Sequence, residues 1–214
     1  DIYESFAYSC NSSFANIGLQ LDLAAFANHN RSMLFNSPLP LEIPYKQSSF
    51  TLNASSSTFM IMQTSFGQGE TLVSPIHLAL VTSAIANNGI LMKPQLVDRI
   101  EDAGGSTLKE FLPESSSRLL STDEAEFMRQ AMRDVAVYGT GSILGADGNY
   151  TAYGKTGTAE TATVRDGNYD HSWFTGFAEN NGQTLVVCAM IENSQKAGLT
   201  GVYTAKQLFN YYFN

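Results

Sequence analysis

Tyr153-Gly154-Lys155-Thr156-Gly157-Thr158-Ala159-Glu160 is the stretch with the densest chemistry in the chain. As a strand it presents one cation, Lys155, and two hydroxyls, Thr156 and Thr158, and Gly157 lets a ligand lie against the backbone. An extended ligand can pair with such an edge, and the ammonium and hydroxyl groups can receive a carboxylate. The alternative is a solvated strand edge with a chance Lys-Thr-Gly, because a three-residue motif is short. The rest of the chain has to decide between them.

The bulk composition is that of a globular protein with no nucleic-acid partner. The 214 residues suffice for one sizeable domain or two small lobes sharing a core. A net charge of −8 without a basic cluster argues against nucleic acid and against a basic membrane-surface patch. No apolar run is long enough to span a bilayer, and the start at Asp1 lacks signal-like features. Either the protein is cytoplasmic or its targeting segment is not in this chain.

The cysteines and histidines show no metal-binding or disulfide pattern. Cys10 and Cys188 are far apart in the sequence, and His29, His77 and His171 have no ligand spacing relative to them or to one another. We therefore predict no structural metal, no cofactor and no disulfide framework. Cys188 lies in an apolar run and is interpreted as a small buried hydrophobe.

The first half of the chain is predicted to be rich in helices. Ser9 and Asn11 lie at a loop-to-helix junction, because Phe14, Ile17 and Leu21 follow with the spacing of one helix face. Further helices are predicted over 23–34 and from Ser74 and Pro75 to Asn88-Gly89, and a long surface loop over 36–57.

The second half is predicted to contain an antiparallel meander closed by a helix. A small hairpin is expected over 96–112, and Ser121 with Glu124 forms a capping box that begins another helix. The remaining predictions are strands over 151–163, 172–178 and 184–192, a turn at Asn180-Asn181-Gly182 and a helix over 205–212. This order indicates an α/β or α+β fold with two lobes. Three strands are few, so we expect further strands from outside this segment.

The polar residues suggest acyl transfer, which needs a nucleophile. A Ser-His-Asp triad is disfavoured because none of the three histidines lies in a glycine-rich or junctional setting. A serine can instead use a lysine three residues later on a helix as its proton acceptor. Only Ser106-Thr107-Leu108-Lys109 has that spacing, and it lies in the predicted hairpin. A strand points residues three apart to opposite faces, so we interpret this match as coincidental.

Two motifs carry a resemblance to a known family. Ser9-Cys10-Asn11, followed far downstream by Lys155-Thr156-Gly157-Thr158, resembles the second and third motifs of penicillin-binding protein transpeptidases and serine β-lactamases, whose motifs are S-x-x-K, S-x-N and K-T-G. Other segments, in the right order, resemble class B penicillin-binding proteins: Phe66-Gly67-Gln68-Gly69-Glu70, Ser74-Pro75-Ile76-His77-Leu78-Ala79, Ile85-Ala86-Asn87-Asn88-Gly89, Tyr138-Gly139-Thr140-Gly141 and His171-Ser172-Trp173-Phe174-Thr175-Gly176-Phe177. Because the match covers nearly the whole chain, it favours a functional site over a chance motif.

The resemblance implies a β-lactamase/transpeptidase-like fold, with an antiparallel sheet flanked by helices plus a helical lobe. Residues 1–214 would form a single, partial transpeptidase domain. Its mostly helical lobe would cover 1–138, with the small hairpin near 96–112, and 139–214 would supply sheet strands and the C-terminal helix. We expect the S-x-x-K nucleophile and the first strands to lie upstream of Asp1, which leaves the sheet incomplete in this chain.

The resemblance also assigns roles to residues. Ser9 would relay protons between the missing serine-lysine pair and the leaving group, and Asn11 would bind the substrate amide and orient the missing lysine. Lys155, Thr156 and Thr158 would hold the terminal carboxylate of the substrate.

In the same motif, Gly157 would let the substrate approach the strand, and the Thr158 backbone N–H would be one oxyanion donor. Trp173 and Phe174 are interpreted as core aromatics, and Arg165 and His171 as loop residues.

The implied activity is that of a peptidoglycan D,D-transpeptidase, which cross-links D-Ala-D-Ala stem peptides through a serine acyl-enzyme and is inhibited by β-lactams. The alternatives are a β-lactam sensor, a non-catalytic peptidoglycan-binding module, and a β-lactamase or D,D-carboxypeptidase. Without the nucleophile, this chain alone should not be acylated.

Implied partners are stem peptides, β-lactams and cell-wall synthesis or division proteins, with association through an exposed sheet edge. The implied location is the extracytoplasmic face of the bacterial membrane, with an anchor in an N-terminal segment absent here.

Overall fold

The structure is a computed structural model that describes residues 1–145, 149–160 and 170–214, with only the backbone of 195 and 196. In chain order its elements are α1 (Ile2–Ala7), α2 (Asn11–Gly18), α3 (Leu23–Ser32), α4 (Thr58–Ser65), α5 (Pro75–Ala86), β1 (Ile90–Met92), β2 (Arg99–Glu101), β3 (Thr107–Glu110), β4 (Ser115–Arg118), α6 (Thr122–Val137), the 3₁₀ helix η1 (Ser142–Leu144), β5 (Thr151–Ala159), β6 (His171–Asn180), β7 (Gln183–Ile191), α7 (Ser194–Ala197) and α8 (Gly201–Phe213).

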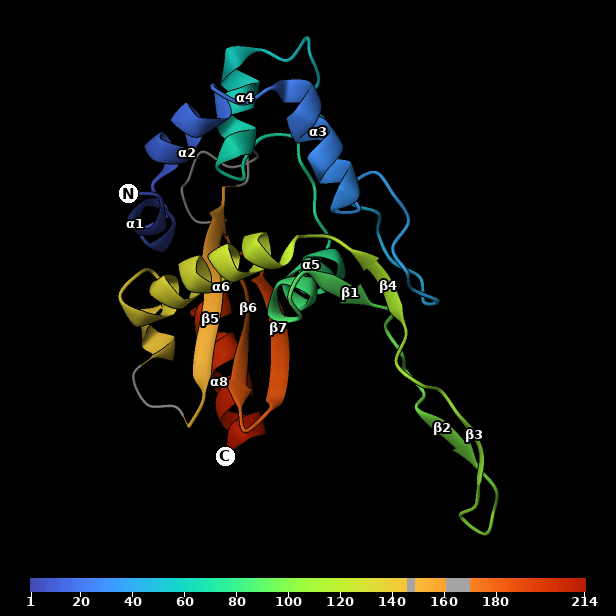
Figure 1. The fold of residues 1–214 in the computed structure, drawn as a ribbon. Helices are drawn as coiled ribbons and strands as arrows, with labels where there is room; N and C mark the ends of the chain where they lie inside the picture. Colours follow the sequence, from blue (N-terminus) through green and yellow to red (C-terminus); the bar gives the residue numbers. More distant parts are fainter. Residues whose placement is uncertain (146–148, 161–169) are drawn as a thin grey trace.

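The main sheet consists of three antiparallel strands in the order β5-β6-β7 (Figure 1). The register pairs Lys155 with Thr175 across β5 and β6, and Thr175 with Cys188 across β6 and β7. The turn between β6 and β7 has positive φ at Asn181 (49°) and Gly182 (78°), the conformation that two-residue hairpin turns favour. The turn predicted at this position is therefore confirmed.

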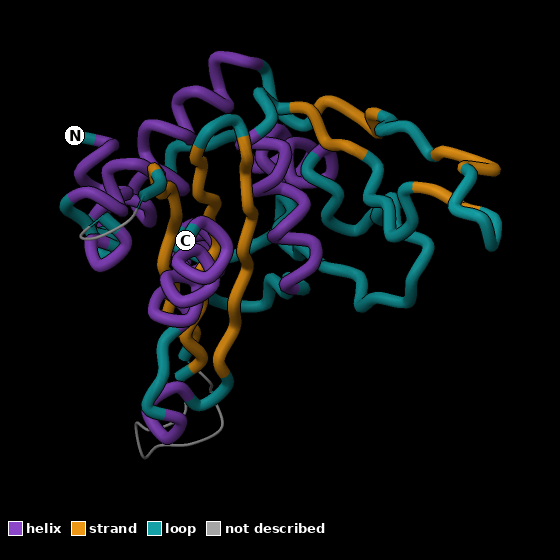
Figure 2. Tube along the Cα trace, turned by 90° about the horizontal axis from the view of Figure 1, so that it is seen from below, coloured by secondary structure: helices purple, strands orange, loops and turns teal. Residues whose placement is uncertain are grey.

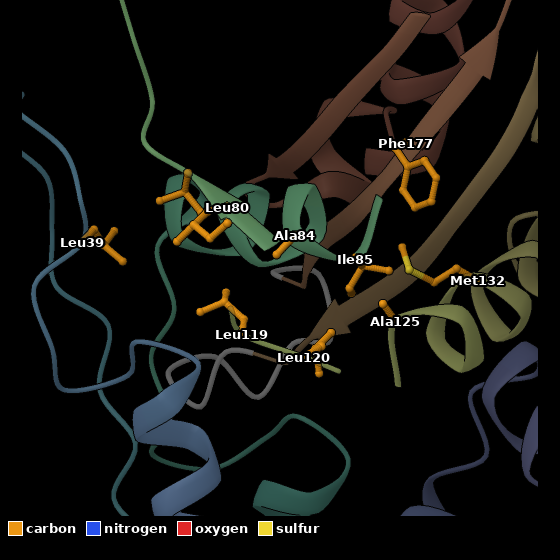
Figure 3. Close-up of a cluster of buried hydrophobic side chains, with 10 residues drawn as sticks. Leu39, Leu80, Ala84, Ile85, Leu119, Leu120, Ala125, Met132 and Phe177 are labelled. Carbon is orange, nitrogen blue, oxygen red and sulfur yellow. The ribbon is translucent and has the colours of Figure 1, made fainter. Parts of the chain in front are cut away.

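Helices cover both faces of this sheet. Helix α8 packs on one face, where Phe174 and Phe209 are fully buried, and α5 and α6 pack on the other around Phe177 (Figures 1 and 2). Phe174 and Phe177 point to opposite faces because strand side chains alternate. Figure 3 shows the buried cluster on the α5 and α6 side, in which Met132 of α6 lies beside Phe177 and Leu80 of α5 lies farther from it, beyond Ala84 and Ile85.

A half-buried ion pair ties α6 to the sheet. The Arg129 guanidinium donates to both carboxylate oxygens of Glu179 on β6, at 3.1 and 2.8 Å. The same guanidinium lies over the stacked rings of Tyr153 and Phe177, 4.9 and 5.1 Å from their centroids. The bidentate geometry fixes α6 against β5 and β6 more firmly than a single point charge would.

The helices α2, α3 and α4 form a separate group beyond one end of the sheet (Figure 1). Gly18 of α2 is buried against Ser65 of α4, where a Cβ on Gly18 would overlap the Ser65 hydroxyl. Helix α1 packs instead on α6.

Several predicted helices are confirmed with small changes of length. Ser74 caps α5 with Pro75 in its first turn, and Ser121 and Glu124 form the predicted capping box of α6. The helix expected through Leu21 ends earlier, at Gly18, and α4 within 58–65 was not predicted.

The segment 96–112 contains the hairpin β2–β3, which projects away from the sheet (Figure 1). The antiparallel pairing of β1 with β4, which brackets this hairpin, was not predicted. The mixed α/β architecture with antiparallel sheets agrees with the predicted fold class.

The chain between the end of β5 and the start of β6 carries two sequence predictions. His171 is the first residue of β6, paired with Ala159, so its interpretation as a loop residue is wrong. Strand β5 ends at Ala159, and the continuation expected over 161–163 and the loop assignment of Arg165 lie outside the described residues.

Candidate active site

The site is built on the outer edge of β5. In an antiparallel strand, the N–H and C=O of one residue point to the same side and successive residues alternate. The Thr156 carbonyl accepts a hydrogen bond from Lys155 Nζ at 2.8 Å, and the Thr158 carbonyl accepts one from Gln68 Nε2 at 3.0 Å. Both carbonyls therefore face away from β6. The Thr158 N–H must face the same open side, where a ligand can reach it.

Ser9 is held by the end of helix α1. The Cys10 N–H donates to the Ser5 carbonyl at 2.8 Å, and the Ser9 N–H donates to the Phe6 carbonyl at 3.2 Å. These two bonds define a Schellman motif with Ser9 at the left-handed position, and its φ is 55°. Glycine is usual at that position because a side chain is disfavoured there, so a serine indicates that its hydroxyl has a use.

Lys155 and Ser9, 146 residues apart in the sequence, meet across the site. Lys155 Nζ donates to Ser9 Oγ at 2.9 Å and lies 5.6 Å from the centre of the Phe6 ring. Burial of the ammonium lowers the pKa of Lys155 to about 8. A lysine with such a pKa changes charge close to neutral pH, so the Lys155–Ser9 pair can exchange a proton.

Asn11 begins α2 directly after the Ser9 turn and is exposed. The turn is fixed by side-chain bonds, in which Ser13 Oγ donates to Cys10 Sγ at 3.2 Å and Ser5 Oγ to Ser13 Oγ at 3.0 Å. Ser9 and Asn11 are therefore brought to one rigid turn. Within the described part of the chain, no hydrogen bond joins the Asn11 side chain to β5.

Gln68 is a site residue that sequence reasoning missed. Helix α4 also ends in a Schellman motif, because the Gln68 N–H donates to Gln63 O and the Gly67 N–H donates to Thr64 O. Gly67 takes the left-handed position with φ 87°. The two helix ends thus aim Ser9 and Gln68 at the same strand. The Gly-Gln-Gly sequence is typical of a turn, but no local pattern indicates that Gln68 contacts Thr158.

Thr140 is a second site residue that was missed. Its Oγ1 lies 2.6 Å from Thr156 Oγ1, and its backbone N–H donates to the Ala7 carbonyl at 3.0 Å. The segment Tyr138-Gly139-Thr140-Gly141 was noted for its resemblance alone, which gave no reason to link Thr140 with Thr156.

Side chains alternate along β5, so Thr156 and Thr158 share one face while Lys155 and Gly157 share the other. Gly157 is paired with Trp173, whose Cβ would lie 3.3 Å from a Cβ at position 157.

Phe174 is fully buried, which confirms its interpretation as a core aromatic, whereas Trp173 is half-buried beside Gly157.

This arrangement can receive an extended anionic ligand. It combines the ammonium of Lys155, the hydroxyls of Thr156 and Thr158, and the outward N–H of Thr158. Among the described residues, no cluster of His, Cys, Asp or Glu side chains could hold a metal ion. The Ser106–Lys109 match lies on the exposed β2–β3 hairpin, remote from β5 (Figures 1 and 2). Within the described ranges, no helix has the length and apolarity to cross a membrane.

Comparison with known proteins identifies the family to which the chain belongs. The model of the penicillin binding protein transpeptidase domain matches residues 1–212. The chain is 28% identical over 192 residues to peptidoglycan D,D-transpeptidase PbpA of Mycolicibacterium smegmatis, covering 90% of this chain and 38% of that protein. It is 27% identical over 201 residues to penicillin-binding protein 3 of Bacillus subtilis, covering 92% and 29%.

Solved structures agree with this match. The D,D-transpeptidase domain of a peptidoglycan glycosyltransferase from Eggerthella lenta superposes with a TM-score of 0.82 at 25% identity, covering 100% of this chain and 52% of that chain. The ceftriaxone acyl-enzyme complex of penicillin-binding protein A from Mycobacterium tuberculosis gives 0.80 at 25% identity, covering 96% and 46%. The chain thus spans 38% and 29% of the two curated relatives above, and about half of these structures. With residues 1–212 of its 214 residues matched by one family model, the chain belongs to the penicillin-binding protein transpeptidase family.

Proposed function

We propose that this chain forms the carboxylate-binding and proton-relay side of a peptidoglycan D,D-transpeptidase centre. The observation that carries the proposal is the 2.9 Å contact between Lys155 Nζ and Ser9 Oγ. That contact joins the two motifs, which lie 146 residues apart in the sequence, beside the open edge of β5.

In the proposed reaction, a serine supplied together with its S-x-x-K lysine attacks the carbonyl of the penultimate D-alanine of a stem peptide. The C–N bond to the terminal D-alanine breaks, and that residue leaves with a proton on its nitrogen. The amine of a second stem peptide then attacks the acyl-enzyme, releases the serine and forms the cross-link. A β-lactam enters the first step in place of the peptide and leaves a covalent acyl-enzyme.

The residues of this chain bind, orient and move protons in that sequence. Ser9 passes a proton between the serine-lysine pair and the leaving nitrogen, because its Oγ accepts from Lys155 and its own proton stays free to donate. Lys155, Thr156 and Thr158 hold the terminal carboxylate. The Thr158 N–H, on the open side of β5, stabilises the oxyanion, and Gly157 lets the peptide approach.

Asn11 is assigned two roles: it binds the substrate amide and it orients the lysine of the S-x-x-K pair. Its exposed place on the Ser9 turn supports these roles, because a group facing solvent can meet a ligand.

The chain alone should not be acylated, because its one S-x-x-K match lies on the exposed β2–β3 hairpin. Incubation with a fluorescent penicillin, followed by denaturing electrophoresis, tests this. The expected result is no labelled band, with labelling restored when the chain is expressed together with an S-x-x-K segment from a relative. Label that maps to Ser106 would overturn the assignment of the nucleophile.

The partners and location follow from the same proposal. Stem peptides and β-lactams would bind at β5, cell-wall synthesis or division proteins would be further partners, and the protein would work on the extracytoplasmic side of the membrane. The family membership and the β-lactam complexes of structural relatives support these assignments.

A further inference from the structure

Thr140 touches both parts of the site. Its backbone N–H donates to the carbonyl of Ala7, two residues before Ser9, and its hydroxyl contacts the hydroxyl of Thr156, directly after Lys155. It also lies on the loop that follows α6, an element separate from the helix end and the strand that carry the motifs. One residue therefore connects three elements at the point where the proposed carboxylate site forms.

The backbone around Thr140 is built for this close approach. Gly139 is buried, and a Cβ at this position would overlap the Ala7 carbonyl oxygen and lie 2.8 Å from Val135 Cα. The loop closes on α6 through the Gly139 N–H to Asp134 O and the Gly141 N–H to Val135 O, both at 3.1 Å. Thr140 itself is exposed, so its hydroxyl pair with Thr156 faces the open site and is not a core contact.

The hydroxyls of Thr140 and Thr156 carry one proton each, so the pair can donate only two hydrogen bonds. A threonine hydroxyl donates one hydrogen bond and accepts up to two. If Thr156 gives its proton to a bound carboxylate, the 2.6 Å contact with Thr140 survives only with Thr140 as the donor. A donor behind Thr156 polarises its O–H bond and turns its proton toward the ligand.

We propose that Thr140 is a positioning residue that orients the Thr156 hydroxyl toward the ligand's carboxylate, and so contributes to selectivity for a free C-terminal carboxylate. The inference rests on the proposed function, because it assumes that β5 receives that carboxylate. It adds a residue outside both motifs to the determinants of ligand choice. Thr140 acts through Thr156 and need not touch the ligand.

The test measures binding of two probes, diacetyl-L-lysyl-D-alanyl-D-alanine and its C-terminal carboxamide, to the full 214-residue chain by NMR titration. Thr140→Val removes the hydroxyl at nearly constant shape, and Thr140→Ser keeps it. Thr204→Val is the control, because it removes a threonine hydroxyl whose hydrogen bond, to the Thr200 carbonyl, stays within the α8 end of the chain. Thermal melts show whether each variant keeps the fold.

Thr140→Val should weaken binding of the carboxylate probe by roughly three- to tenfold, the loss expected for one hydrogen bond between neutral groups. It should leave binding of the carboxamide unchanged. Thr140→Ser should restore most of the preference, and Thr204→Val should match the wild type. In a Thr156→Val background, Thr140→Val should have no further effect, because its target is already gone.

Three outcomes would overturn the inference. If Thr140→Val weakens binding of both probes equally, Thr140 has a merely structural role. If the Thr140→Val variant prefers the carboxylate probe as strongly as the wild type does, Thr140 has no role in ligand choice. Both leave the proposed function intact. A wild-type chain that binds neither probe, or binds both equally, would overturn the proposed function and the inference with it. If Thr140→Val melts before it can be titrated, Thr140→Ala is measured in its place, with the same expected loss.

Discussion

At the scale of single residues, the site depends on two side chains in unfavourable settings. Ser9 adopts a left-handed conformation that a non-glycine residue seldom takes, and Lys155 is desolvated enough that burial lowers its pKa to about 8. The left-handed backbone of Ser9 and the burial of Lys155 both cost folding free energy. Each also gives its side chain the property that the site uses. Ser9 points its hydroxyl at Lys155, and Lys155 becomes able to lose a proton near neutral pH.

The lowered pKa of Lys155 predicts how ligand binding depends on pH. The ammonium attracts a carboxylate, so affinity is full well below pH 8 and falls as the pH rises through about 8, instead of through the ordinary value of 10.5. Titration of the carboxylate probe between about pH 6 and pH 10 should show this midpoint. Lys155→Arg should remove the pH dependence, because the guanidinium stays charged throughout. The carboxamide probe is the matched control, and a midpoint near the ordinary lysine value would contradict the prediction.

The conformation of Ser9 predicts a conflict between stability and activity. Ser9→Gly relieves the left-handed strain and should stabilise the fold by about 0.5–1 kcal/mol, which raises the melting temperature by about 1–4 °C. Ser9→Ala removes the same hydroxyl but keeps the strain, so it should not stabilise. Both should abolish cross-linking by a transpeptidase reconstituted with its nucleophile. Denaturation curves of the two variants provide the comparison, and equal stabilities would show that position 9 is unstrained.

At the scale of elements, the site forms where two helix ends and one loop meet the edge of β5. Ser9 arrives from the end of α1, Gln68 from the end of α4 and Thr140 from the loop after α6. The close approach of α1 to α6 depends on Gly139, which leaves space for the Ala7 carbonyl.

Gly139→Ala should therefore separate α1 from α6 and damage both fold and site. The added methyl overlaps backbone atoms, which cannot move as easily as a side chain, so we expect a loss of about 1–3 kcal/mol in stability. Gly104→Ala is the control, because that glycine lies in the exposed hairpin turn with only the Asp102 side chain nearby. Urea denaturation measures both. Equal, small losses of stability in the two variants would mean that the α1–α6 contact tolerates the added methyl group.

Local signals in the sequence sufficed for most elements, but not for the contacts between them. Ser74 with Pro75, the Ser121–Glu124 capping box and the Asn181-Gly182 turn each act over a few residues, and each prediction is confirmed. Helix α4 was missed because its residues have no clear amphipathic spacing. Contacts such as Gln68 with Thr158, 90 residues apart, depend on how separate elements pack, and one sequence carries no local trace of that.

Within the site, Lys155, Thr156 and Ser9 were found through their motifs, because those motifs are contiguous. Gln68 and Thr140 were missed as site residues because each contributes one polar atom from a turn. The neighbouring glycines already account for each turn, so no separate sign of a site residue appears there in the sequence.

At the scale of the whole molecule, the two edges of the main sheet differ. At the edge of β5, Ser9, Gln68 and Thr140 bring polar side chains from other elements to the strand. Strand β7 has α5 and α8 packed against its faces, yet in the part of the chain that the structure describes its outer edge pairs with no strand. A nine-residue strand with both faces covered and an open row of backbone groups is a site for pairing with another strand.

We therefore expect the chain to associate through β7, either with a further segment of a longer protein or with a second copy. Sedimentation velocity over a range of concentrations should show oligomers, and hydrogen exchange of β7 amides should slow as they form. A cooperative, monodisperse monomer at all concentrations would contradict this expectation.

The paired Schellman ends of α1 and α4 also bear on how such a site can diverge. Both ends are fixed by main-chain hydrogen bonds, which do not depend on the side chain that each turn presents. Position 68 can therefore accept a different side chain, and position 9 any residue that tolerates a left-handed backbone, without displacing the helices. Mutational drift at these two places would alter what the strand edge recognises while the scaffold keeps its shape, so new ligand preferences can arise here one substitution at a time.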